Sequence, residues 1–146
     1  MLSLTFIPDL AGVDPVIICK ADRDLTGMNP KITSHRHLQH EDRLFAEFAV
    51  VYDRGNKRTT LSLDVRRAMN NKSAAFASEA DAFVWALDHP DDFPGTGTLV
   101  IDFGGANIRW LLNCGVEVLE MPELLGKAPL FRYTFNGGEI TKDNPL

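Results

Sequence analysis

The sequence has few cysteines and no long run of hydrophobic residues. Its two cysteines, Cys19 and Cys114, lie far apart and outside any CxxC spacing. They are expected to be buried thiols in a reducing compartment, unless the fold brings them close enough to form a bridge. No window approaches the ~18 apolar residues that a membrane helix needs, and the first residues lack both a basic region and an apolar stretch long enough for export. We therefore predict a protein that is cytoplasmic at synthesis and has no membrane partner.

An excess of positive charge is also missing. The formal net charge is -5 and the pI is about 5.3, which argues against nucleic-acid binding because phosphate contacts need a concentrated basic surface. The two basic pairs, Lys57-Arg58 and Arg66-Arg67, flank predicted strands or turns and are interpreted as solvated edges. Hydrophobic residues make up 45% of the 146 residues and charged residues 24%. These values are ordinary for one globular domain, here residues 1–146, with a core of its own.

Alternation of apolar and polar residues predicts that most of the chain forms β-strands. Turn residues at 53–56, 104–105 and 113–115 are each expected to reverse the chain into a hairpin. The expected strands are residues 2–6, 16–19, 45–52, 61–66, 99–103, 108–112, 116–121 and 130–135.

A single helix is predicted at about 79–89. Ser78 and Asp81 fit a capping box at its start, and Pro90 ends it, because the residue before a proline is pushed out of the α region. The helix carries four apolar residues at the i, i+3, i+4, i+7 spacing of one face, which we expect to cover the sheet: Ala80, Phe83, Val84 and Leu87. The predicted fold class is α+β, mainly an antiparallel β-sandwich or partly rolled barrel with one flanking helix.

Residues 20–42 show little periodicity and are predicted to form a long loop or arm, while residues 141–146 form a polar, frayed tail. Three histidines in the long loop, His35, His37 and His40, are of a type that zinc or nickel accepts. Neither helical nor strand geometry brings all three together, so we expect an exposed loop there and no metal site.

No other pattern predicts catalysis or a cofactor. Gly104-Gly105 follows an apolar strand, but the next segment is a strand and not a helix N-terminus, so a hairpin turn is expected in place of a phosphate site. Cys114 has no local signature of an activated nucleophile. Trp85 lies beside the apolar face of the helix, and an exposed Trp85 would mark a subunit interface.

The order of the segments resembles small phage and prophage tail proteins of the tail-tube and distal-tail kind, over about residues 45–140. The residues that carry the resemblance are the run Leu61-Ser62-Leu63-Asp64-Val65, the helix, and the segments 94–99, 108–112 and 131–135. The resemblance implies a sandwich or partly rolled barrel whose copies join edge to edge into rings and stack into a tube. It also implies a long loop that reaches a neighbouring subunit, a role that residues 20–42 could fill.

We therefore predict a non-enzymatic structural subunit that forms homo-oligomers, contacts other tail proteins and is located in a virion tail. The predicted interface residues are Arg23, Met28, Lys31, His35, His37 and Trp85. Two alternatives remain open at this point. A binding module would use a concave face of the sheet with Arg109, Trp110 and Tyr133. A small, metal-dependent enzyme would bring His37, His89 or Cys114 next to a carboxylate.

Overall fold

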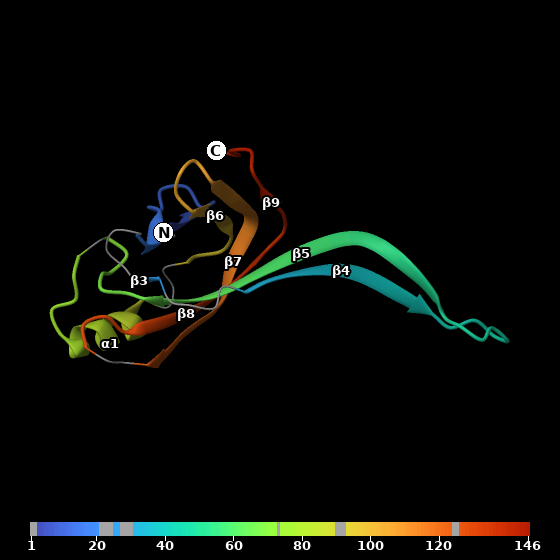
Figure 1. Ribbon diagram of the computed structural model, residues 1–146, viewed down its shortest axis with the longest axis horizontal. Coiled ribbons are helices and arrows are strands. Elements are labelled where there is room, and N and C mark those ends of the chain that lie inside the picture. The colour runs from blue at the N-terminus through green and yellow to red at the C-terminus, as the bar shows by residue number, and fades with distance from the viewer. Residues whose placement is uncertain (1–2, 21–24, 27–30, 73, 90–92, 124–125) are drawn as a thin grey trace.

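The computed structural model describes residues 3–20, 25–26, 31–72, 74–89, 93–123 and 126–146. Its strands form one connected sheet in which all the pairings are antiparallel, in the order β2-β1-β6-β7-β8-β5-β3, with β4 on β5 and β9 on β7 (Figure 1). Among the described residues the two ends of this strand order do not pair, so the sheet is not closed into a barrel. The predicted α+β class, rich in antiparallel sheet and with one short helix in the part of the chain that the structure describes, is confirmed. The elements are β1 (Ser3–Pro8), β2 (Val16–Cys19), β3 (Leu25–Thr26), β4 (Lys31–Glu41), β5 (Val50–Arg66), α1 (Glu79–Asp88), β6 (Gly97–Asp102), β7 (Ile108–Glu123), β8 (Leu130–Gly137) and β9 (Ile140–Thr141).

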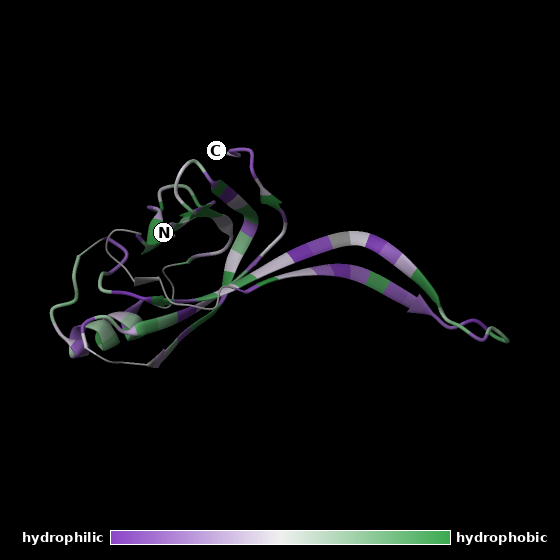
Figure 2. Ribbon diagram, viewed as in Figure 1, coloured by the Kyte–Doolittle hydropathy of each residue, from purple (hydrophilic) through white to green (hydrophobic). Residues whose placement is uncertain are grey.

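The core is formed by the alternating apolar residues of these strands, as the sequence predicts. On β8, Phe131, Tyr133 and Phe135 are fully buried, and the ring of Tyr133 stacks between the other two. β1 lies toward the other end of the strand order, and its residues Leu4 and Phe6 are also fully buried. Burying aromatic rings of this size is the largest single source of stability in a domain of this kind. Hydrophobic segments accordingly gather in the body of the protein (Figure 2).

β5 is one continuous strand, so the predicted chain reversal at 53–56 is wrong. Residues 54–56 form a bulge opposite His37: Arg36 pairs with Lys57, and the next pair is Leu38 with Asp53. The Asp53 carboxylate accepts a hydrogen bond of 2.8 Å from the Gly55 amide, and Gly55 has a φ of 78°. The residues at 53–56 therefore form the hydrogen bond and adopt the positive φ that are typical of a turn, but the strand continues through them. The chain reverses earlier, in residues 42–49.

β7 is also continuous, and the predicted reversal at 113–115 is wrong for the same reason. Asn113 has a φ of 50°, which bends the strand without turning it back. β7 pairs with β6 up to Cys114 and with β8 from Gly115 onward. The reversal predicted at Gly104-Gly105 does occur, between β6 and β7, with positive φ at both glycines.

The segment predicted as a long loop contains the strand β4, which pairs with β5 along its whole length. Its sequence lacks alternation because nearly every residue of β4 is exposed, so neither face selects apolar residues. Residues 21–24 and 27–30 of this segment lie outside the described residues.

α1 begins and ends where the sequence predicts, but it buries the other side. The Ser78 hydroxyl accepts a hydrogen bond of 3.2 Å from the Asp81 amide, which confirms the N-cap. Residues 82, 85, 86 and 89 have the same i, i+3, i+4, i+7 spacing as the predicted face, and Ala82, Trp85 and Ala86 pack inward. The predicted face therefore points to solvent. No helix in the described part of the chain is long and apolar enough to cross a membrane.

Arg67 is fully buried, so the interpretation of the Arg66-Arg67 pair as a solvated edge is wrong for Arg67. Its guanidinium lies over the ring of Trp85 and donates hydrogen bonds to the hydroxyl of Tyr133 and the carbonyl of Ile17. A single side chain thereby joins the end of β5 to α1, β8 and β2.

Candidate functional site: an exposed two-stranded arm

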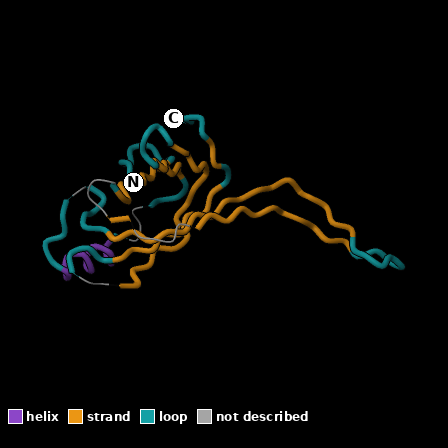
Figure 3. The backbone as a smooth tube through the Cα atoms, in the orientation of Figure 1, coloured by secondary structure: helices purple, strands orange, loops and turns teal. Residues whose placement is uncertain are grey.

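The most distinctive feature of the molecule is a two-stranded arm, residues 31–58, that projects from the body. It consists of β4, the connecting residues 42–49, which we call the tip, and the outer part of β5 (Figures 1 and 3). At about 3.4 Å per residue, the strand β4 alone is on the order of 35 Å long. The hydrophobic core contains no residue of the arm in the described part of the chain.

Exposed polar contacts between its two strands support the arm. Arg36 forms an ion pair of 3.3 Å with Asp53, and the Arg54 guanidinium donates a hydrogen bond of 2.7 Å to the Gln39 side chain. Exposed contacts of this kind contribute at most about 1 kcal/mol each. A two-stranded ribbon without a packed face is only marginally stable in water. Packing against another surface would therefore stabilise the arm.

The tip carries three large hydrophobic side chains that point into solvent. The exposed fractions are 84% for Leu44, 99% for Phe45 and 78% for Phe48. Phe45 also has a φ of 64°, a backbone conformation that is unfavourable for a bulky residue. Figure 2 shows hydrophobic segments toward the far end of the arm and mainly hydrophilic ones along it. The tip is therefore an apolar surface without cover in the single chain.

A basic cleft lies along the middle of the arm. It has a volume of about 370 Å³ and is lined by His35, Arg36, His37, Lys57 and Arg58. The strand register places His35 directly opposite Arg58 and Arg36 opposite Lys57. Like charges at directly paired positions repel each other. Among the described residues Arg36 alone of these three Lys and Arg side chains has an acidic partner, Asp53, so the cleft keeps an excess of positive charge.

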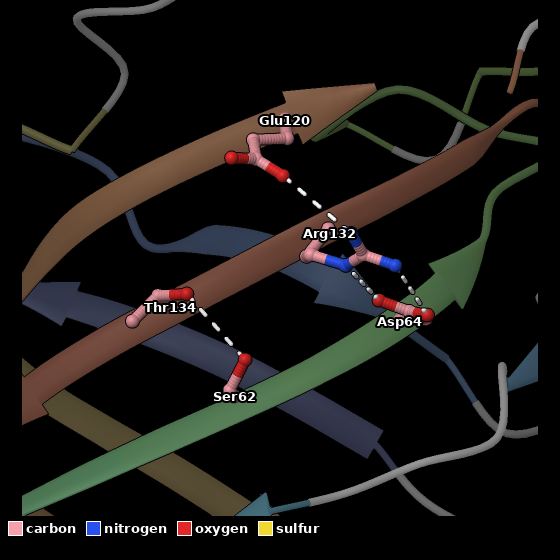
Figure 4. Close-up of polar contacts among 5 residues, drawn as sticks. All are labelled: Ser62, Asp64, Glu120, Arg132 and Thr134. Atoms are coloured by element: carbon pink, nitrogen blue, oxygen red, sulfur yellow. Dashed lines mark hydrogen bonds and ion pairs between the residues drawn. The ribbon is translucent and has the colours of Figure 1, made fainter. Parts of the chain in front are cut away.

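The sheet face beside the arm differs from the basic cleft, because its positive charge is paired with acidic side chains. Arg132 on β8 contacts Asp64 on β5 at 2.9 Å and Glu120 on β7 at 3.6 Å (Figure 4). The hydrogen bonds that the Arg132 guanidinium donates to the Asp64 carboxylate, followed by the negative charge of that carboxylate, raise the pKa of Arg132 above its usual range. Ser62 and Thr134 form a further cross-strand contact of 3.5 Å. The unbalanced positive charge is thus a property of the arm rather than of the whole sheet.

The predicted interface residues fall in different places. Lys31, His35 and His37 lie on β4 and are exposed, whereas Arg23 and Met28 lie outside the described residues. Trp85 is packed against Phe76, Phe131 and Arg67 and so lacks the exposure on which its prediction as an interface residue depended. The three apolar tip residues were missed, because an apolar loop and the start of an apolar strand have the same sequence signal.

The groups proposed for metal binding or catalysis are not brought together. In the described residues, no three His, Cys, Asp or Glu side chains lie close enough to hold a metal ion, and His40 pairs with Val51 beyond the bulge that follows Arg36. His37 is on the arm, while the ring of His89 stacks on Trp85 at the end of α1. Tyr133, proposed for a binding face, is fully buried beneath Arg67.

Cys114 is a core residue whose burial raises the pKa of its thiol to about 12. We expect neither cysteine to react with a disulfide reagent at pH 8 in the folded protein, and both to react after unfolding in urea. Because the pKa of Cys114 in the folded state lies above its ordinary value of 9.0, its contribution to stability is complete below about pH 9 and is lost as the pH rises toward 12. Rapid reaction of one thiol in the native protein would contradict this assignment.

No protein-family model matches the chain, and no curated protein matches its sequence.

Proposed function

We propose that this protein is a structural subunit that assembles with copies of itself through the arm, as part of a phage-like tail. The observation that carries the proposal is the apolar tip at the end of an exposed arm that contributes nothing to the core of its own chain. Exposed clusters of large apolar side chains mark interaction sites, because leaving them in water is unfavourable. Burying them on another copy would also fix the arm in one conformation.

The sheet supports the same proposal. β2 lies at one edge of the strand order, and β3 and β4 lie along the other side of β5 at the opposite edge. Open edges offer unpaired backbone amides and carbonyls to another strand. Subunits that join edge to edge and reach a neighbour with a long arm are what the resemblance to tail-tube and distal-tail proteins implies.

The proposal predicts that removing the apolar character of the tip weakens self-association. We expect the variant Leu44→Ser/Phe45→Ser/Phe48→Ser to keep its fold and to associate at least about tenfold more weakly, because buried aromatic anchors dominate most interfaces. Sedimentation velocity over a range of concentrations measures this change.

A matched control removes three exposed apolar residues of the body: Leu10→Ser/Phe103→Ser/Leu146→Ser. It should associate as the natural chain does. Equal association of the tip variant and the natural chain would contradict a role for the tip.

A further inference from the structure

The exposed face of α1 is a second apolar surface without cover. Phe83, Val84 and Leu87 are 43%, 51% and 62% exposed, and at 100° per residue they form one continuous stripe, which we call the α1 stripe. Glu79 flanks the stripe on one side, and Asp81 and Asp88 flank it on the other. α1 has no basic residue in its last turn, so the negative end of the helix dipole near Asp88 is not compensated within the helix.

The charge of the chain is divided between the arm and the rest. Residues 31–58 contain six Lys or Arg and four Asp or Glu, a net charge of +2, whereas the whole chain carries -5 and the remaining residues therefore carry -7. The positive excess of the arm lies in the basic cleft, because the tip itself contains more acidic than basic residues. The acidic residues that flank the α1 stripe therefore complement the charge of the cleft and do not complement that of the tip.

The two surfaces also match in size and apolar character. Ile32 and Leu38 are exposed on β4, one before and one after the cleft residues 35–37 along the strand, and about 20 Å apart. A ten-residue helix is about 15 Å long. The α1 stripe can therefore lie across the cleft and contact Ile32 or Leu38, while its acidic flanks lie near the positive charge of the cleft.

The two surfaces cannot meet within one chain. α1 lies at the end of the body opposite to the direction in which the arm projects (Figure 1). We propose that the α1 stripe of one copy docks on the basic cleft of the arm of a second copy. This inference rests on the proposed self-assembly through the arm, and it identifies α1 as the surface of the neighbouring copy that the arm contacts. Because the two contact surfaces differ, the contact is head-to-tail and is repeated from copy to copy, which generates rings or filaments.

A charge exchange tests this pairing. In the first variant, Lys57→Glu/Arg58→Glu, both the arm and α1 are acidic. In the second, Asp81→Lys/Asp88→Lys, both the arm and α1 are basic. Each variant alone should associate at least about tenfold more weakly than the natural chain, because like charges face each other at every contact. In an equal mixture the acidic arm meets the basic helix and the basic arm meets the acidic helix, so association should be restored.

The control variant Lys127→Glu/Lys142→Glu makes the same change in net charge as the first variant, on exposed body residues, and should associate as the natural chain does. Circular dichroism and urea unfolding establish that each variant is folded. If both charge variants associate as strongly as the natural chain and the tip variant does not, the docking of α1 is overturned. Assembly through the arm then still stands. Weak association of both variants without rescue in the mixture would also overturn it. A natural chain that stays monomeric would overturn the proposed function itself.

Discussion

Replacing residues 35–58 with an Asn-Gly turn is expected to give a folded monomer. Ser34 and Thr59 are directly paired across the two strands, so a two-residue turn can join them in the same register. The replacement keeps Thr59, whose hydroxyl donates a hydrogen bond to the Gly138 carbonyl. None of the buried core residues lies in the removed segment. We expect the free energy of unfolding to change by less than about 1 kcal/mol, because shortening a surface connection has a small entropic effect.

Urea unfolding and sedimentation velocity measure the two halves of this prediction, the fold and the association. An unfolded or aggregated product would contradict the description of the arm as separate from the core. A shortened chain that still forms the same complexes as the natural chain would contradict assembly through the arm.

Arg67→Ala is expected to destabilise the protein by about 3–5 kcal/mol, because it removes a buried side chain that several elements share. The Arg67 guanidinium donates hydrogen bonds to the Tyr133 hydroxyl at 2.7 Å, the Ile17 carbonyl at 3.0 Å and the Asn71 side chain at 3.2 Å. It also lies 5.1 Å from the centre of the Trp85 ring. The substitution removes the hydrogen bonds that the guanidinium donates and opens a cavity under α1.

Two further variants separate the contributions to this effect. Arg67→Met fills most of the volume and should recover part of the loss, but it does not restore the hydrogen bonds that the guanidinium donates to Tyr133 and Ile17. The control Arg58→Ala removes an exposed arginine of the arm and should change stability by less than about 0.5 kcal/mol. Urea unfolding monitored by tryptophan fluorescence measures all three. A loss below about 1 kcal/mol for Arg67→Ala would show that the guanidinium does not hold these elements together.

The sequence predicted correctly the elements whose pattern is set by burial on one face. β1 and β8 alternate because one side of each strand faces the core, and α1 has a cap that acts within one turn. The sequence failed where long-range pairing decides the outcome. The residues at 53–56 and 113–115 adopt the positive φ that their composition favours, but a local signal for positive φ does not distinguish a bulge from a chain reversal.

The candidate site was harder to predict for a related physical reason. β4 is exposed on both faces, so no apolar period marks it as a strand. α1 offers two faces with the same spacing, and the sequence does not indicate which of them packs inward. The structure buries Ala82 and partly buries Trp85 and Ala86, because Arg67 and Phe131 provide a surface for the Trp85 ring. The larger apolar face is left for another contact.

Hydrogen–deuterium exchange of the natural chain, below and above the concentration at which it associates, tests the central claim most directly. Assembly through the arm predicts that the amides of the tip, residues 42–49, exchange more slowly in the associated protein, because the tip is exposed in the single chain and covered in the assembly. Association that leaves exchange in the tip and along β4 unchanged, and slows it only in the body, would contradict the claim.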